Sequence, residues 1–122
     1  MERRKDERYV VNNERIVRVK VMLDKTEWQD VYIKNISLHG VGLSLLVVDV
    51  DVAVKVDKNI YLKFFDVSES DTMKEILELK GFVRWGEKDN IKNVIKLGVQ
   101  FDDIKENDKK IINEIIELVS YG

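Results

Sequence analysis

The sequence predicts a mainly β fold: a small antiparallel β-barrel of about six strands, followed by one C-terminal α-helix. Successive segments place an apolar residue at every second position, which is the period of a half-buried strand. Only the last segment changes to the helical period of three and four residues. No helix is expected between the strands, so the sheet should be antiparallel. Closing this sheet into a barrel removes its exposed edges.

The first two strands are expected at residues 15–23 and 28–36, where they form a hairpin. Valines alternate with charged residues in the first segment. Residues 24–27 have the composition of a turn. The polar segment 35–40 closes the second strand and predicts another turn.

The following segments complete the predicted sheet. The clearest alternation is a run of valines at every second position between residues 48 and 56. Because barrel strands need large inward side chains, Trp28 and Trp85 are expected to pack in the core, with stacking on a base as the alternative. The remaining strands are expected at 41–48, 48–56, 60–67, 75–85 and 92–101.

An amphipathic helix is expected at about residues 105–119. Its apolar positions form a stripe that should pack on the barrel. Asn107 or Asp103 is expected to cap its start. The stripe consists of Ile111, Ile112, Ile115, Ile116 and Val119.

The composition excludes several classes of function. The 122 residues include 21 basic and 23 acidic ones, and the net charge of −2 disfavours binding of a nucleic acid polymer. The absence of cysteine and the single histidine exclude disulfides, cysteine nucleophiles and multi-histidine metal sites. No base, nucleophile or carboxylate pair has an informative spacing, so neither an enzyme nor a metal site is expected. No segment is apolar enough for a signal peptide or membrane insertion, which predicts a cytoplasmic protein.

The N-terminus is the first feature that the fold does not explain. The first eight residues carry seven charges and no apolar residue after the initial methionine. We therefore expect residues 1–9 to form a flexible arm and residues 10–122 to form the domain. Within the arm Arg4 and Arg8 are separated by three residues, and Arg3 directly precedes them. Taken alone, this pattern also fits a solvated charged terminus.

The second such feature is the segment 35–40, which reads Asn-Ile-Ser-Leu-His-Gly. Asn35 and Ser37 are two residues apart, so both side chains should lie on one face of a strand or turn. Gly40 would let the backbone turn or approach a neighbour closely. Taken alone, a plain turn between two strands has the same composition.

Together the two features resemble the signature of the PilZ family, bacterial receptors for the second messenger cyclic di-GMP. That signature is Arg-x-x-x-Arg, a spacer, and Asp/Asn-x-Ser-x-x-Gly. Residues 4–8 supply the first part and residues 35–40 the second, with 26 residues between them. Residues 81–85 and 98–101 also look like the strands that precede the family's final helix. The resemblance implies a six-stranded antiparallel β-barrel with a C-terminal α-helix.

The resemblance also implies one or two molecules of cyclic di-GMP as ligand, and no other cofactor. Arginine forms paired hydrogen bonds with phosphate oxygens or with O6 and N7 of guanine, so Arg4 and Arg8 are assigned to these groups. Asn35 and Ser37 are assigned to the N–H donors of guanine. Gly40 would permit a close backbone approach. Arg3, just before the signature, is implied to influence whether one ligand or a pair binds.

The predicted function is that of a cyclic di-GMP receptor or adaptor. Its arm would be free without ligand and would order over the barrel on binding. Since the sequence shows no effector domain, the signal is expected to pass to a separate, unidentified protein effector. The alternative is a PilZ-like scaffold that acts through protein contacts without nucleotide binding. A third alternative, a barrel for single-stranded nucleic acid, would need a basic groove with exposed aromatics.

Overall fold

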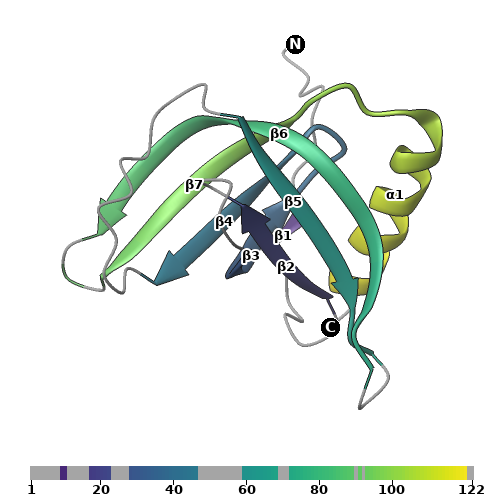
Figure 1. Ribbon diagram of the computed structural model, residues 1–122, viewed down its shortest axis with the longest axis horizontal. Coiled ribbons are helices and arrows are strands. Elements are labelled where there is room, and N and C mark those ends of the chain that lie inside the picture. The colour runs from purple at the N-terminus through teal and green to yellow at the C-terminus, as the bar shows by residue number, and fades with distance from the viewer. Residues whose placement is uncertain are drawn as a thin grey trace, which may run out of the picture.

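The computed structural model describes residues 9–10, 17–22, 28–46, 59–68, 72–89, 91 and 93–120. In this part of the chain the fold is an antiparallel β-barrel with one C-terminal helix, which confirms the predicted class (Figure 1). The valine-rich strand predicted at residues 48–56 lies outside the described residues.

Six strands of the described chain form the barrel, each antiparallel to its neighbours. They follow the order β3-β2-β5-β6-β7-β4, and β4 pairs with β3 to close the sheet. They correspond to the other strands predicted from the sequence, and β6 continues past its expected end at residue 85. Their bounds are Val17–Met22 for β2, Gln29–Ile36 for β3, Gly40–Leu46 for β4, Asn59–Asp66 for β5, Lys74–Asp89 for β6 and Val94–Phe101 for β7.

A short strand, β1 (Tyr9–Val10), extends the sheet beside β3. It pairs with β3 at Ile36 and Asn35. At the same two positions β3 pairs with β4 on its other edge. The register of β2 with β3 covers only the first three residues of β3. The strand β1 therefore lies along the part of the β3 edge beyond β2.

One shift of register between β5 and β6 lies at Phe64 and Phe65. Two further β-bulges shape the outer surface of the barrel. One lies in β3 between Ile33 and Asn35, opposite β4, and the other in β6 between Val83 and Trp85, opposite β7. A bulge adds one residue to one strand, so the alternation of inward and outward side chains shifts at that point. Both bulges change the orientation of side chains that strict alternation would turn inward.

The barrel encloses one apolar core, which continues beneath the helix. On β2, for example, Val17, Val19 and Val21 are buried, while Arg18 between them is exposed. Burying such side chains is the main favourable contribution to folding, at about 25 cal/mol per Å² of apolar surface. The period-two pattern of the sequence is therefore the direct cause of the barrel.

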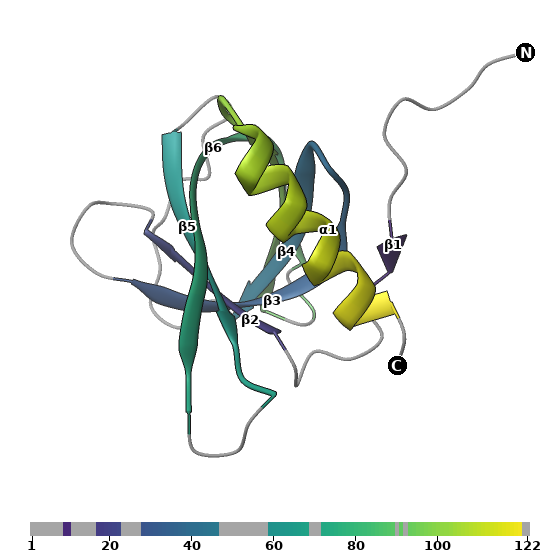
Figure 2. The same ribbon diagram turned by 90° about the vertical axis from the view of Figure 1, so that its right-hand side faces the viewer.

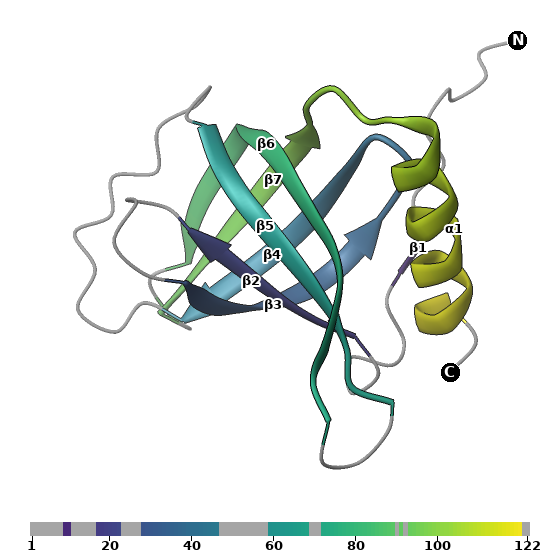
Figure 3. The same ribbon diagram turned by 45° about the vertical axis from the view of Figure 1, so that its right-hand side comes forward.

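The helix α1 (Glu106–Ser120) lies against one side of the barrel and contacts β1, β2 and β6 (Figures 2 and 3). Its predicted stripe is confirmed, because Ile112, Ile115, Ile116 and Val119 are buried and Ile111 is half-buried against the same core. In the part of the chain that the structure describes, no helix is both long and apolar enough to span a membrane.

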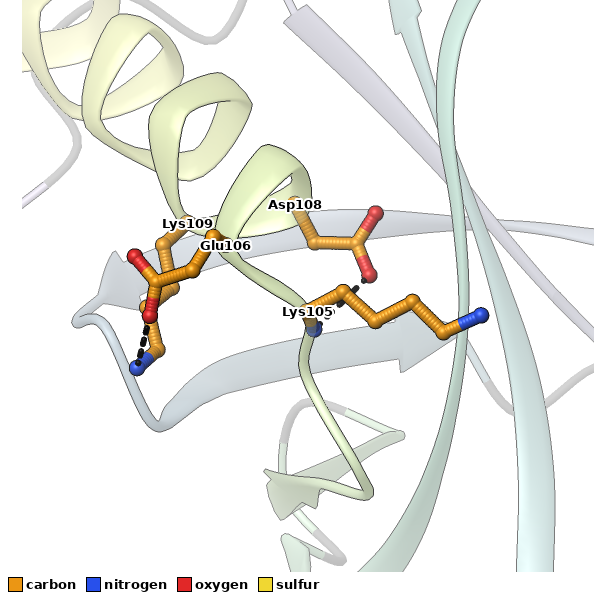
Figure 4. A network of polar contacts seen from close by, with 4 residues as sticks. All are labelled: Lys105, Glu106, Asp108 and Lys109. Carbon is orange, nitrogen blue, oxygen red and sulfur yellow. Dashed lines mark hydrogen bonds and ion pairs between the residues drawn. The ribbon is translucent and has the colours of Figure 1, made fainter.

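The start of α1 is held by polar contacts (Figure 4). The carboxylate of Asp108 accepts a hydrogen bond from the backbone N–H of Lys105 at 3.2 Å, which is one half of a capping box. The Nζ of Lys109 lies 3.3 Å from Oε1 of Glu106. The sequence favoured Asn107 or Asp103 as the cap, whereas the structure gives a capping contact to Asp108.

Candidate functional site

Ser37 organises the turn between β3 and β4. Its side chain is 1% exposed. Its Oγ accepts hydrogen bonds from the backbone N–H groups of His39 and Gly40, at 3.2 and 3.1 Å, and can donate to the carbonyl oxygen of Gly40 at 3.3 Å. The backbone N–H of Ser37 donates to the same carbonyl at 2.9 Å. The hydroxyl therefore serves as donor and acceptor within its own turn.

The same turn is fixed to β7. The backbone N–H of Phe101 donates to the carbonyl of His39 at 2.8 Å, while the side chain of His39 is exposed. A β-carbon on Gly40 would collide with the carbonyl oxygen of Val99, which belongs to the backbone and cannot rotate away. Gly40 thus permits a close backbone approach, and here that approach is to β7.

Asn35 lies on the outer face because of the bulge in β3. Val31 and Ile33 are buried, and strict alternation would bury residue 35 as well. After the bulge the buried position is Ile36, and Asn35 is half-buried. Its amide rests against Gly42 of β4, where an added β-carbon would lie 2.6 Å from Nδ2 and 2.8 Å from Oδ1.

The turn therefore gives Asn35 and Ser37 different surroundings. Asn35 belongs to the outer face of the sheet, whereas Ser37 is buried within the turn. The expectation that both side chains lie on one face stays a prediction. The bulge lies before Asn35 and does not separate the two residues, which differ in burial. The exposed Lys34, with its Nζ 6.0 Å from the ring centroid of Tyr32, adds a positive charge beside Asn35. The sequence reasoning had not included it.

The strand β1 brings the N-terminal segment to this turn. It pairs with β3 at Asn35 and Ile36, and the pairing is antiparallel, so its N-terminal end points toward the turn. Arg8 directly precedes β1 in the sequence. Arg3, Arg4 and Arg8 lie outside the described residues, so their assigned contacts stay predictions.

The two tryptophans do not lie where they were expected. Trp85 is 42% exposed on the outer face, and Trp28 is only partly buried, with the Nζ of Lys63 4.5 Å from its ring centroid. The alternating pattern places residues 83 and 85 on one face of β6, but a bulge lies between them. Core packing was therefore the wrong prediction for Trp85.

The fold is similar to solved structures of bacterial proteins. One is the PilZ domain with c-di-GMP of YcgR from Escherichia coli, with a TM-score of 0.69 and 11% identity over 97% of this chain and 92% of that one. Another is the Bacillus subtilis inhibitor of motility, MotI/DgrA, with a TM-score of 0.67 and 17% identity. That match covers 97% of this chain and 51% of the other. A third is Borreliella burgdorferi PlzA in complex with c-di-GMP, with a TM-score of 0.61 and 11% identity. That match covers 92% of this chain and 50% of the other. The chain thus spans about half the length of MotI/DgrA and of PlzA.

The sequence comparisons identify the family. No curated protein matches the sequence. The PilZ domain family, in contrast, matches residues 2–118, which include both the segment 4–8 and the segment 35–40. The barrel with its C-terminal helix agrees with this match. The chain therefore belongs to the PilZ domain family.

Proposed function

We propose that this protein binds cyclic di-GMP at the β3–β4 turn and the outer face beside it. The pairing of β1 with β3 carries the proposal, since it holds the residues that directly follow Arg8 beside Asn35. The PilZ match and the solved PilZ proteins with bound c-di-GMP support the same ligand. The residues that directly follow the first part of the signature thus lie beside the second part, although 26 residues separate the two parts in the sequence.

Arg4 and Arg8 are the proposed contacts to phosphate and guanine. The planar guanidinium forms two parallel hydrogen bonds with phosphate oxygens, or with O6 and N7 of guanine. The ligand carries two phosphodiesters and two guanines, so two arginines can engage both kinds of group. Arg3 would add a third positive charge, which favours a second ligand molecule and gives a stoichiometry of one or two.

Asn35 is the proposed guanine contact on the barrel itself. Its amide oxygen can accept hydrogen bonds from the N1–H and N2–H groups of guanine. Ser37 has a different part, because its Oγ already accepts from two backbone N–H groups. A direct contact with guanine would compete with these bonds, so its main contribution is to hold the turn. Gly40 keeps the same turn against β7.

The arm was predicted at residues 1–9, and Tyr9 is already paired in β1. Ligand binding is proposed to order the part of the arm that precedes β1 over the barrel. Ordering the arm costs conformational entropy, which the free energy of ligand binding offsets. The arm therefore covers the barrel, and changes its surface, only when the ligand is bound. We propose that a separate protein effector reads this surface and that the receptor performs no catalysis and acts in the cytoplasm. The competing proposal remains a PilZ-like scaffold that acts by protein contacts without nucleotide.

Calorimetric titration with cyclic di-GMP tests the binding proposal. The unsubstituted protein is expected to bind, and Arg8→Ala should weaken binding by about tenfold or more, since a charge-assisted hydrogen bond is lost. Arg18→Ala is the matched control, because it removes an exposed arginine from β2 and should leave the affinity unchanged. Absence of binding at near-millimolar protein would overturn the proposal and favour the scaffold.

Amide hydrogen exchange tests the ordering of the arm separately. Exchange in residues 1–8, which precede β1, should slow when cyclic di-GMP is added, because ordered amides exchange only after local opening. Calorimetric binding with unchanged exchange in this segment would contradict the ordering of the arm while leaving the ligand assignment intact.

A further inference from the structure

The outer face of β2 and β5 carries cations with carboxylates on both sides. One row of register partners crosses four neighbouring strands from β3 to β6, in the order Asp30, Lys20, Lys63 and Glu78. The charges along this row are therefore negative, positive, positive and negative. Arg18, two residues before Lys20, adds an exposed cation to the same face of β2.

The cations of this face differ in their partners. The Nζ of Lys63 lies 3.4 Å from Oε1 of Glu75 and 3.8 Å from Oε1 of Glu78, so its charge is compensated within the sheet. Arg18 and Lys20 form no ion pair with any residue that the structure describes. The uncompensated positive charge of the face therefore lies on β2.

An apolar row lies directly beside these cations. Met22 of β2 pairs with Tyr61 of β5, and the ring of Tyr61 is 37% exposed. Trp28, the residue before β3, has the Nζ of Lys63 4.5 Å from its ring centroid. Because β2 lies between β3 and β5, the indole and this lysine meet over β2. The face thus combines free positive charge with an adjoining patch of half-buried apolar side chains.

The order of the charges disfavours a second copy of the chain as the occupant of this face. In a two-fold symmetric contact the same surface of both copies meets. An axis along the strands would place Lys20 opposite Lys63 of the second copy, and Asp30 opposite Glu78. An axis across the strands would place each charge opposite itself. Both arrangements bring like charges together.

The same order favours a narrow acidic partner over an extended anionic surface. Neighbouring strands are spaced so that Asp30 and Glu78 lie about 14 Å apart. A helix with its side chains is about 10–12 Å wide and fits between them, whereas an anionic membrane would also meet these two carboxylates. Single-stranded nucleic acid needs free aromatic faces, but a lysine Nζ already lies over the rings of Trp28 and Phe65.

We propose that the outer face of β2 and β5 docks an acidic amphipathic helix of the protein effector. Its carboxylates would face Arg18 and Lys20, and its apolar side chains would pack on Met22 and Tyr61. The inference deepens the proposed function, because it rests on the separate effector proposed there and names the chemistry of its docking segment.

The docking face and the ligand site lie on different sides of the barrel. In the sheet order β2 and β5 are opposite β7 and β4, and β4 is the strand beside Asn35 (Figure 3). The protein can therefore hold the ligand and the effector helix together. The helix would bind with or without ligand, while another part of the effector reads the surface that the ligand changes.

Nuclear magnetic resonance titration tests the docking face with two synthetic peptides as probes. One is an amphipathic helix of leucine, alanine and glutamate, and the other has lysine in place of each glutamate. The glutamate peptide should shift the backbone signals of β2 and β5, and the lysine peptide should not. The double variant Arg18→Glu/Lys20→Glu should bind the glutamate peptide about tenfold more weakly and should gain affinity for the lysine peptide.

A control variant separates the position of the charges from their sum. Lys88→Glu/Lys110→Glu makes the same change in net charge with two exposed lysines outside β2 and β5, and it should bind the glutamate peptide like the unsubstituted protein. Circular dichroism and an unchanged affinity for cyclic di-GMP check that the Arg18→Glu/Lys20→Glu protein is folded. An equal loss of peptide binding in both double variants would reduce the effect to net charge and refute a docking face.

The outcomes distinguish the docking face from the proposed function. Absence of shifts on β2 and β5, or equal binding of the two peptides, would overturn the docking face and leave binding of cyclic di-GMP standing. A protein that binds the glutamate peptide on this face but not cyclic di-GMP would overturn the ligand proposal alone. Tighter binding of a thymidine oligonucleotide or of anionic lipid vesicles than of the glutamate peptide would also refute the helix as occupant.

Discussion

The side-chain amide of Asn35 rests against Gly42, its partner across the β3–β4 ladder. The bulge in β3 turns Asn35 outward, and the missing side chain at residue 42 provides the space that its amide occupies. The position of the proposed guanine contact therefore depends on a residue outside the family signature. This relationship links a local backbone irregularity to the chemistry of the site.

Replacing Gly42 by Ala should displace the amide of Asn35 and weaken cyclic di-GMP binding several-fold. The added methyl group would lie within 3 Å of three amide atoms. Because these atoms are the end of a rotatable side chain, the fold should change little. Calorimetry measures the effect, and a double-mutant cycle with Asn35→Ala tests its route. The substitution at residue 42 should have little effect in the Asn35→Ala protein, which has no amide to displace. An equally large loss of affinity in both proteins would show that Gly42→Ala does not act through Asn35.

Replacing Gly40 by Ala should instead lower the stability of the fold. The new β-carbon would meet the carbonyl oxygen of Val99, so β4 and β7 would have to move apart. Such overpacking costs about 1–3 kcal/mol. Urea unfolding should show a clearly larger loss for Gly40→Ala than for Gly42→Ala, which makes the same chemical change two residues later on the same strand. Equal stabilities for the two variants would contradict the argument that a backbone carbonyl beside Gly40 cannot move away, whereas the Asn35 side chain beside Gly42 can.

Replacing Ser37 by Ala should lower both stability and ligand affinity. The substitution removes the acceptor of two backbone N–H groups in a side chain that is 1% exposed. Loss of a buried hydrogen-bond partner costs about 1–3 kcal/mol. His39→Ala is the control in the same turn, because its side chain is exposed and surface changes stay within about 0.5 kcal/mol. An unchanged melting temperature for Ser37→Ala would show that the hydroxyl does not hold the turn.

The sequence was sufficient to predict the barrel and its helix because both depend on repeated burial. The alternating valines of β2 and the isoleucine stripe of α1 each bury several apolar side chains, and every one of these side chains favours the folded state. The turn at residues 35–40 was recognisable because asparagine, serine and glycine each have a local reason to occur there. These features need no knowledge of the neighbouring strand.

The bulges could not be predicted, and they decide the surface of the site. A bulge depends on which residues face each other across two strands, and a single segment does not contain that information. Trp85 was for this reason expected in the core, whereas the bulge in β6 leaves it exposed. The roles of Gly42 and Gly98 were invisible for the same reason, since each lies below a side chain of another strand.

The carboxyl group of Asp66 should titrate below the usual range of an aspartate. The hydrogen bonds from the side chain and the backbone N–H of Ser68, the latter at 2.8 Å, lower the pKa of Asp66. A lowered folded-state pKa means that this contribution to stability is present above the unfolded pKa and is lost as the pH falls through the folded value. Titration followed by NMR measures this pKa directly, and Ser68→Ala should raise it. An Asp66 that titrates at its ordinary value would rule out these hydrogen bonds.

Replacing Asn35 by Asp tests which part of the ligand this residue faces. The signature of the family allows either residue, but an aspartate adds a negative charge and forms charge-assisted hydrogen bonds, which are about twice as strong as neutral ones. If Asn35 faces the N–H edge of guanine, Asn35→Asp should bind cyclic di-GMP several-fold more tightly and Asn35→Ala more weakly. If it faces a phosphate, Asn35→Asp should bind more weakly, and added salt should restore part of the loss because it screens the repulsion. Calorimetry on the three proteins at low and high salt distinguishes the cases. If Asn35→Asp binds more weakly and salt restores the affinity, the assignment of Asn35 to guanine is wrong. The role of its amide would then be to place an uncharged polar group beside the phosphates.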